Sequence, residues 1–408
     1  MKKKIVSLLL TGVMAVGALA GCGGQSIADQ QAASDTAAES TEGGDSAESS
    51  TATMAAADEV DGTEITFWHS MGGVNGQAID ELVNRFNEEN ELGITVVSEY
   101  QGEYDDALNK LRSAQIGNMG ADLVQVYEIG TRFMIDSGWI IPMQEMIDQD
   151  NYDVSQIEPN LAAYYTIDDQ LYSMPFNSST PLMYYNVDMF EKAGITEIPT
   201  SLEGIEAIGD QLLNEGGASE VISLGIYGWF FEQFLGKQGL DYANNGNGRE
   251  EAATAVAFDE NGGAANILNA WKSLSDKGYA PIVGRGGDAG LADFSSGASA
   301  ITLGSTASLK QILQDVNGRF EVGTAYFPSI TDEDQGGVSI GGASLWALNN
   351  NDPKKLRATW EFVKFLISPE SQAYWNAQTG YFPVTVAAQE EQVFKDNIAQ
   401  YPQFQTAI

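Results

Sequence analysis

Polar residues follow several apolar runs in this sequence, and these are the positions where chemistry is expected. The first such segment is Phe67-Trp68-His69-Ser70-Met71-Gly72-Gly73, which contains the only histidine of the chain. A histidine at the end of a strand can act as a base, but only with a suitable partner. The chain has no second histidine and only one cysteine, so we expect His69 to contact a ligand or to hold a loop by hydrogen bonding.

A carboxylate stands in the same position after another strand. Tyr127-Glu128 follows an apolar run, and a carboxylate there can accept hydrogen bonds from ligand hydroxyls. Its alternative role is to cap a helix N-terminus.

Four further segments offer hydroxyls, backbone N–H groups or an aromatic ring. Each has a plain structural alternative, as a turn, a helix cap, a bend or a packing contact. The segments are Phe176–Pro181, Gly304–Ser308, Ile340–Ala343 and Thr379–Pro383. No phosphate-binding glycine loop, metal-ligand cluster or pair of catalytic carboxylates is found, so we expect no cofactor and no enzyme activity.

The elements that position these segments alternate between strand and helix. Glu64–Trp68, Ile94–Val97 and Leu123–Val126 have the composition of strands. Between them, apolar residues recur at helical spacing in two stretches. They are Ile79, Leu82, Val83 and Phe86, and then Tyr104, Leu108, Leu111 and Ile116. This β-α-β-α-β order predicts a parallel sheet with helices on its faces.

The alternation repeats later in the chain. We expect strands at 182–186, 300–303 and 345–348 and helices at 187–193, 201–214, 267–277 and 305–316, with helix starts at Pro353 and Pro369. Two such units do not fit one sheet comfortably, which predicts two α/β lobes. Small-molecule sites concentrate beyond the carboxyl ends of strands and between lobes.

Composition excludes several functions. The 408 residues carry 20 Lys+Arg against 57 Asp+Glu, a formal charge of −37, and such a surface repels nucleic acid. One cysteine excludes a disulfide framework within the chain. Apolar residues make up 43%, which is enough for a substantial core.

The N-terminus has the pattern of a targeting segment. Three lysines precede an apolar run that ends in Leu19-Ala20-Gly21-Cys22, and this resembles a bacterial lipobox. We expect residues 1–21 to be a signal peptide and Cys22 to be lipidated, anchoring the protein outside the cytoplasm on the cell membrane. The alternative is an ordinary signal peptide with a chance cysteine. Residues 22–61 contain no Lys, Arg or aromatic residue, so we expect a disordered acidic tether.

Six short motifs give the chain a family resemblance. FWHSM, LVQVYEIG, PFNSSTPLMYYN, VGR, GGASLW and TGYFP occur in this order. Together they resemble the sn-glycerol-3-phosphate-binding proteins of ABC importers, which are family 1 extracellular solute-binding proteins. The resemblance runs from about Glu64 to Pro383. It implies an α/β, two-lobed periplasmic-binding-protein fold of type II, with a ligand cleft between the lobes and delivery of the ligand to a membrane permease.

The resemblance also implies a set of ligand-binding residues. Matched motif by motif, they fall on Tyr104, Glu128, Ser179, Ser305, Gly342 and Tyr381. Glu128 would accept hydrogen bonds from glycerol hydroxyls, while the hydroxyls and the Gly342 N–H would donate to phosphate.

The sequence departs from the family pattern at two places. Ile226 stands where some members have a tryptophan that lines the site, which implies a roomier pocket that takes a glycerophosphodiester. The family continues to a phosphate-binding arginine, whereas this sequence ends at Ile408. We therefore expect residues 386–408 to be the start of a C-terminal segment that is truncated here.

The resulting organisation has 62–180 plus 340–385 as lobe 1 and 181–339 as lobe 2, in a monomer. The leading function is a receptor for glycerol 3-phosphate or a glycerophosphodiester. A neutral-sugar receptor of the same fold and a secreted glycerophosphodiester-processing enzyme are the alternatives.

Overall fold

The computed structural model describes residues 52–117 and 120–407. The predicted signal peptide, Cys22 and most of the predicted tether lie outside these described residues. Within them, no helix combines the length and the apolar composition needed to cross a membrane.

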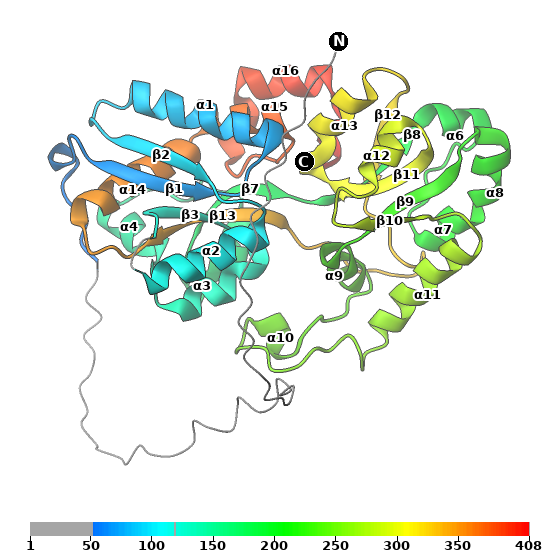
Figure 1. The fold of residues 1–408 in the computed structure, drawn as a ribbon, viewed down its shortest axis with the longest axis horizontal. Coiled ribbons are helices and arrows are strands. Elements are labelled where there is room, and N and C mark those ends of the chain that lie inside the picture. Colours follow the sequence, from blue (N-terminus) through cyan, green and yellow to red (C-terminus); the bar gives the residue numbers. More distant parts are fainter. Residues whose placement is uncertain (1–51, 118–119, 408) are drawn as a thin grey trace, which may run out of the picture. The chain divides into compact units, whose positions relative to one another are not determined.

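The first lobe is built on a six-stranded sheet (Figure 1). Its strand order is β2-β1-β3-β13-β4, and β7 also pairs with β13. The parallel pairs β1·β2 and β1·β3 confirm the predicted β-α-β-α-β unit, whereas β13 runs antiparallel to β3, β4 and β7. The strands are β1 Glu64–His69, β2 Thr95–Tyr100, β3 Leu123–Tyr127, β4 Ile140–Ile141, β7 Met174–Ser179 and β13 Gly341–Leu348.

Helices cover both faces of this sheet, because its strands are apolar on both sides. In Figure 1, α1 lies over one face, and α2 and α3 lie over the other. The helices are α1 Gly73–Glu89, α2 Tyr104–Ile116, α3 Thr131–Ser137, α4 Met143–Asp150, α5 Pro159–Tyr165, α14 Pro353–Leu366 and α15 Pro369–Thr379. A small hairpin of β5 (Thr166–Ile167) and β6 (Gln170–Leu171) follows α5.

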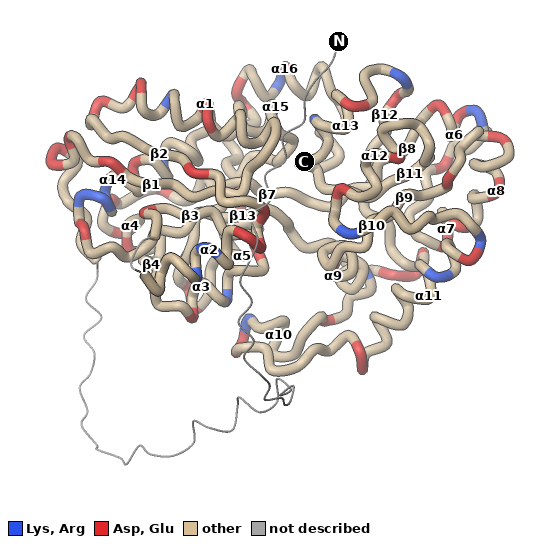
Figure 2. The backbone as a smooth tube through the Cα atoms, viewed as in Figure 1, with Lys and Arg blue, Asp and Glu red and all other residues tan. Residues whose placement is uncertain are grey.

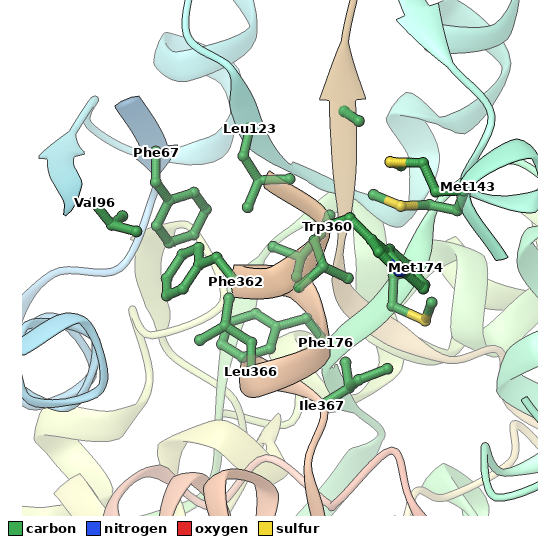
Figure 3. Packing of buried hydrophobic residues seen from close by; sticks show 14 of the residues in the cluster. Phe67, Val96, Leu123, Met143, Met174, Phe176, Trp360, Phe362, Leu366 and Ile367 are labelled. Carbon is green, nitrogen blue, oxygen red and sulfur yellow. The ribbon is translucent and has the colours of Figure 1, made fainter. Parts of the chain in front are cut away.

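The core of this lobe follows the alternation of side chains along each strand. Phe67, Leu123 and Leu345 face one cluster, which includes α1 and α14, while Trp346 faces the other cluster with α2 and α3. Figure 3 shows Phe67, Phe362 and Leu366 packed together, with Trp360 beside Met143. All four predicted core residues of α1 are buried.

One predicted core position of α2 is wrong. Leu108 and Leu111 are buried, but Ile116 is 88% exposed. Ile116 is the last residue of α2, so the helix ends before it can carry this side chain back to the sheet.

An ion cluster fastens α14 to the end of α4. Asp150 accepts hydrogen bonds from Arg357 Nη1 at 2.8 Å, Trp360 Nε1 at 2.9 Å and Lys364 Nζ at 2.8 Å. Burial alone would raise the pKa of Asp150. The hydrogen bonds from Lys364, Arg357 and Trp360 outweigh it and hold that pKa well below its ordinary value.

The predicted extent of the disordered tether is corrected by the structure. Residues 52–61, assigned to the tether from composition, lie against the first lobe. Met54 and Val60 are buried in its core, the 3-10 helix η2 spans Ala57–Glu59, and the Ala55 N–H donates to Pro353 O at 2.9 Å. Burial of these two apolar side chains, together with this backbone hydrogen bond, docks a segment whose charged residues are all acidic.

The second lobe has its own sheet of five strands, in the order β10-β9-β11-β8-β12. Strands β9, β10 and β11 run parallel, and β8 pairs antiparallel with β11 and β12. The two separate sheets confirm the predicted pair of α/β units. The strands are β8 Pro181–Asn186, β9 Glu220–Ile226, β10 Ile282–Arg285, β11 Ser299–Ser305 and β12 Val322–Tyr326.

Helices also flank the second sheet on both faces. Met183 and Tyr184, neighbours on β8, belong to separate buried clusters on the two faces. The helices are α6 Val187–Ala193, α7 Leu202–Ala207, α8 Gly209–Gln211, α9 Gly228–Lys237, α10 Asn244–Gly248, α11 Gly263–Asp276, α12 Leu291–Ser296 and α13 Leu309–Val316. The helix predicted over 201–214 starts as expected, with α7, and Ser201 Oγ caps it by accepting from the Gly204 N–H at 2.9 Å. The predicted helix over 201–214 is interrupted at Ile208 and ends in a π-helical turn, Leu212–Gly216.

The chain passes between the two sheets at Thr180 and again between β12 and β13. The predicted lobe boundaries at 180 and 340 fall at these two passages. The predicted C-terminal segment forms α16 (Gln392–Gln400) and a 3-10 helix, η7 (Pro402–Ala407). Phe404 of η7 joins a core cluster of the second lobe, and Gln403 Nε2 donates to Val322 O at 3.0 Å.

Candidate functional site

The six residues matched to the family motifs come from both lobes, and the structure brings them together. Tyr104 lies at the N-terminus of α2, and its ring stacks on Tyr127 with the ring centroids 5.2 Å apart. The Tyr104 hydroxyl accepts a hydrogen bond from Asn177 Nδ2 at 3.0 Å. Tyr381 lies beside both, because its hydroxyl interacts with Tyr104 and Asn177. Burial raises the pKa of both tyrosines, so their hydroxyls remain neutral donors.

A buried relay of amides orients the Tyr104 hydroxyl. The Ser70 N–H donates to Gln125 Oε1 at 2.8 Å, and Gln125 Nε2 donates to Asn177 Oδ1 at 2.7 Å. The Asn177 amide then donates to Tyr104. Since the Tyr104 oxygen already accepts a bond, its proton points at a different acceptor, and Tyr381 is that partner within the described residues.

Gly342 and Ser179 lie on neighbouring strands of the β7·β13 pair, where Gly342 is registered with Ser178. Gly342 has φ +94°, and a Cβ on it would lie 1.9 Å from Asn177 O, so only glycine fits there. Its neighbour Gly341 is registered with Ser179, and a Cβ on Gly341 would lie 3.0 Å from Ser179 Oγ. The same Cβ would lie 2.5 Å from the ring of Trp229, which therefore covers this backbone from α9 of the second lobe.

Ser305 lies at the contact between the lobes. It ends β11, and its Oγ accepts from the Ala307 N–H at 3.2 Å as the cap of a 3-10 turn, η5 (Thr306–Ser308). The next residue, Thr306, donates its N–H to Thr180 O at 2.9 Å, one residue from Ser179. A Cβ on Gly380 would lie 2.4 Å from Thr306 O, so the turn that carries Tyr381 also touches this point.

Glu128 provides the only carboxyl among the six residues. It follows β3 and begins a 3-10 turn, and its side chain is buried at 8% exposure. Burial raises the pKa of Glu128 to about 8, and the nearby charge of Glu232 adds to this effect. The backbone oxygen of Glu128 accepts from Thr131 Oγ1 at 2.7 Å and from the Tyr164 hydroxyl at 3.4 Å, which fixes the turn.

The second lobe contributes polar groups that face Glu128. Burial raises the pKa of Glu232, on α9, to about 7. Burial also raises the pKa of Tyr227 to about 12, with smaller effects from Glu128, Glu232, Asp288 and Asp105. Tyr227 is 40% exposed at the end of β9. Acidic side chains of both lobes therefore act electrostatically on Tyr227.

An arginine of the second lobe reaches the first lobe beside this point. The Arg249 guanidinium donates to the backbone oxygens of Tyr164 at 3.1 Å, Thr166 at 3.3 Å and Ala163 at 3.4 Å. It also lies 5.4 Å from the centroid of the Tyr164 ring. These carbonyls end helix α5, where a cation is favourable. Arg249 thus joins the α9–α11 connection to the helix next to Glu128.

His69 lies apart from any catalytic arrangement. It is 3% exposed, its Nδ1 accepts from the Met71 N–H at 3.3 Å, and burial lowers its pKa to about 4. The side chain is therefore neutral near pH 7 and holds its loop, as one of the sequence expectations states. Within residues 52–117 and 120–407, no group of three or more His, Cys, Asp or Glu side chains could hold a metal ion.

A small cavity behind Tyr104 is too small for a solute. Its volume is about 10 Å³, and its wall includes Trp68, Leu108 and Val124. This is close to the volume that a single water requires.

Several residues at the site were not predicted as contacts. Gln125 had a usable signal, because a glutamine inside the apolar strand Leu-Val-Gln-Val-Tyr needs a buried partner. Trp229 lies three residues after Ile226, the position singled out in the sequence, but was not itself predicted as a contact. Arg249, Glu232 and Tyr227 gave no local signal, since their partners are distant in sequence.

Comparison with known proteins identifies the family of the chain. The family model described as bacterial extracellular solute-binding protein matches residues 81–406. The chain is 36% identical over 336 residues to the sn-glycerol-3-phosphate-binding periplasmic protein UgpB of Salmonella typhimurium, covering 80% of this chain and 76% of that protein. It is 34% identical over 335 residues to the UgpB protein of Pectobacterium atrosepticum, covering 80% and 74%.

Solved structures give the same result for the fold. The crystal structure of UgpB from Mycobacterium tuberculosis in complex with glycerophosphocholine matches with a TM-score of 0.73 and 26% identity, over 84% of this chain and 85% of that one. The GacH receptor of Streptomyces glaucescens, solved unliganded and with acarbose, matches with a TM-score of 0.69 and 20% identity, over 85% and 87%. At that identity, the second match supports the fold alone. By its sequence, its two α/β lobes and these matches, the chain belongs to the bacterial extracellular solute-binding proteins.

Proposed function

We propose that this protein is the substrate-binding receptor of an ABC importer and binds sn-glycerol 3-phosphate or a glycerophosphodiester. The observation that supports this most is the donor set at the contact between the lobes. The Tyr104 and Tyr381 hydroxyls interact with Asn177, and Gly342 packs against the Asn177 backbone oxygen. Ser179 and Ser305 adjoin the contact between Thr180 and Thr306, and the buried Glu128 carboxyl acts electrostatically on both tyrosines.

The roles divide by chemistry. Phosphate oxygens accept hydrogen bonds only, so they match the hydroxyls and the backbone N–H. Glycerol hydroxyls can donate, so they match Glu128, which has the wrong sign for phosphate. The relatives named for glycerol 3-phosphate and the neighbour solved with glycerophosphocholine support this class of ligand.

We favour a diester over a monoester, because the proposed pocket has room for the bulkier of the two ligands. Ile226, which stands where a tryptophan would line the site, is 55% exposed. A smaller side chain at this position leaves space for the group esterified to the phosphate. The proposed cycle is capture of the ligand, closure of the lobes about the passages at Thr180 and Ile340, and delivery to the permease, with no catalytic step.

The proposed location is the outer face of the cell membrane. Cys22 would be lipidated, and the residues between Cys22 and Thr51 would link that anchor to the folded lobes. The protein would act as a monomer. A single lipid chain binds a membrane only marginally, so the proposal requires the multiple acyl chains typical of lipoproteins.

A neutral sugar is the second candidate. Sugar hydroxyls could donate hydrogen bonds to the carboxyl groups of Asp105, Glu232 and Asp288. Sugar rings could stack on the tyrosines near them. Titration calorimetry with glycerol 3-phosphate, glycerophosphocholine and maltose separates the two. We expect heat of binding for at least one glycerophosphate and none for maltose. Saturable binding of maltose without binding of either phosphate would refute the proposal.

A further inference from the structure

An arm of the second lobe, residues 241–258, lies between α9 and α11 and contacts the first lobe. It carries α10, and Figure 1 shows it projecting from the second lobe. None of the six residues matched to the family motifs lies on this arm, and neither of the two large sheets includes it. Its role is therefore distinct from that of the residues proposed to hold the ligand.

The arm keeps its shape through its own hydrogen bonds. The Ala257 N–H donates to Tyr242 O at 2.8 Å. One step further along, the Asn244 N–H donates to Ala255 O at 3.1 Å, as in a hairpin. The Asn247 side chain closes the tip, because its Oδ1 accepts from the Tyr242 N–H at 2.8 Å. A segment with these internal bonds moves as one piece.

Aromatic rings fasten the base of the arm to α9. The Phe258 ring lies edge-on to Phe231 of α9, with the ring centroids 5.2 Å apart. It also lies edge-on to Tyr242, with the centroids 4.9 Å apart. The arm is therefore part of the second lobe and follows its movements.

The tip of the arm presents one cation to the first lobe. Arg249 is the one basic residue among residues 241–258, and in Figure 2 it is marked by the blue segment beside the α10 label. Residues 245–248 just before it all have positive φ, between 56° and 79°, a turn that its two glycines favour. Within the described residues, every hydrogen bond between the arm and the first lobe comes from Arg249.

The partner of Arg249 is the last turn of α5. Its bonds go to the carbonyl oxygens of Ala163, Tyr164 and Thr166, at a helix end where carbonyls lack amide partners and a cation is favourable. The Tyr164 ring, 5.4 Å from the guanidinium, adds a cation–π contact. Arg249 is exposed to water, so these contacts are weak enough to break when the lobes separate.

The same tyrosine touches the turn that positions Glu128. The Tyr164 hydroxyl donates to Glu128 O at 3.4 Å, and Thr131 Oγ1 donates to the same oxygen at 2.7 Å. Arg249 therefore binds the first lobe next to the proposed ligand carboxyl. The lobes cannot separate at this point until the Arg249 contacts are broken.

From these contacts we propose that the arm is a latch, in which Arg249 holds the lobes together beside Glu128 and slows the release of bound ligand. The inference rests on the proposed function, because only a receptor that holds a ligand between its lobes has a release step to slow. Contacts that exist with the lobes together and break as they separate raise the barrier to dissociation. Association begins with the lobes apart, so removal of the latch should not slow it.

The test measures both rate constants for glycerophosphocholine by stopped-flow tryptophan fluorescence of the full chain. Arg249→Gln should raise the dissociation rate constant about three- to tenfold, the size expected for losing exposed hydrogen bonds from a cation, without lowering the association rate constant. Arg249→Lys keeps the charge but not the planar fork, so its dissociation rate constant should lie between the two. The control Arg132→Gln removes an exposed arginine of α3 that pairs with Asp136, and it should stay within twofold of the wild type.

A double-mutant cycle separates a latch from a general loss of stability. Asn247→Ala releases the tip of the arm, so it should also raise the dissociation rate constant, and Arg249→Gln should then add little. Fully additive effects of the two substitutions would overturn the inference.

The outcomes also separate the latch from the function beneath it. If the wild type binds and Arg249→Gln releases ligand no faster than Arg132→Gln, the latch is overturned and the function stands. If the wild type binds no glycerophosphate, the proposed function fails, and small-angle scattering of the ligand-free variants decides about the latch. A radius of gyration larger in Arg249→Gln than in Arg132→Gln would support it, and equal radii would overturn it.

Discussion

Glu128 should make ligand affinity depend on pH, with a sign and a size that follow from its surroundings. Burial raises the pKa of the ligand-free carboxyl to about 8. A glycerol hydroxyl that donates to Glu128 favours the ionised form, so binding below pH 8 must release a proton. Roughly a tenth of the carboxyl is ionised at pH 7 and roughly nine tenths at pH 9. Affinity should therefore rise about tenfold over this range, which is about 1.4 kcal/mol.

Few other groups near Glu128 titrate in this window. The pKa values of Tyr127, Tyr164, Tyr165 and Tyr227 are all raised, chiefly by burial, so these side chains stay neutral. Glu232, whose pKa is raised to about 7, is the exception. Glycerophosphocholine is the suitable ligand, because a phosphodiester keeps one charge throughout.

The assay is calorimetry at pH 7, 8 and 9 in two buffers of different ionisation enthalpy, which measures proton release directly. Glu128→Gln should bind with no pH dependence, and should be weaker than the wild type by about 1–3 kcal/mol at pH 9. Glu232→Gln should keep the tenfold rise. Wild-type affinity that is constant from pH 7 to 9, without proton release, would refute the assignment of Glu128 to the ligand hydroxyls.

Three further predictions concern the frame of the site. Gly342→Ala should lower the free energy of unfolding by about 1–3 kcal/mol in urea denaturation, because φ is +94° and the new Cβ would meet Asn177 O. The control is Gly337→Ala, where a Cβ meets nothing within 4 Å. Equal stability of the two variants would contradict the strain argument. Arg249→Gln should increase the radius of gyration of the ligand-free protein in small-angle scattering, since the hydrogen bonds of Arg249 to the end of α5 join the lobes. The control Lys272→Gln, which alters an exposed ion pair on α11, should leave the radius of gyration unchanged. An identical radius in both variants would exclude this role for Arg249. Asp150→Asn should lower the free energy of unfolding by about 1–2 kcal/mol at pH 7. Its folded pKa is depressed, so this difference should begin to shrink as pH falls below the ordinary value of 3.8 and should vanish only as pH falls through the folded pKa; a difference at pH 2 as large as at pH 7 would contradict the ion-cluster account.

The strand-end motifs could be predicted from the sequence because their signal is local. A polar group directly after an apolar strand must lie at the carboxyl edge of a sheet, and this placed Glu128 and Ser305 correctly at strand ends. Motif resemblance then supplied Tyr104, Ser179, Gly342 and Tyr381, which the structure brings together.

The remaining features depend on contacts that no local pattern encodes. The Asn177–Tyr104 bond joins residues 73 positions apart, and the Arg249 bonds cross from one lobe to the other over more than 80 positions. The docking of residues 52–61 was missed for a different reason. Composition predicts whether a segment can fold by itself, but not whether a neighbouring lobe offers Met54 and Val60 a place to be buried.

A crystal structure with glycerophosphocholine tests the central claim most directly. The account predicts phosphate oxygens within hydrogen-bond distance of Ser179 Oγ, Ser305 Oγ, the Tyr381 hydroxyl and the Gly342 N–H, with the glycerol hydroxyls on Glu128. A ligand bound away from these residues, or a phosphate placed against Glu128, would contradict it.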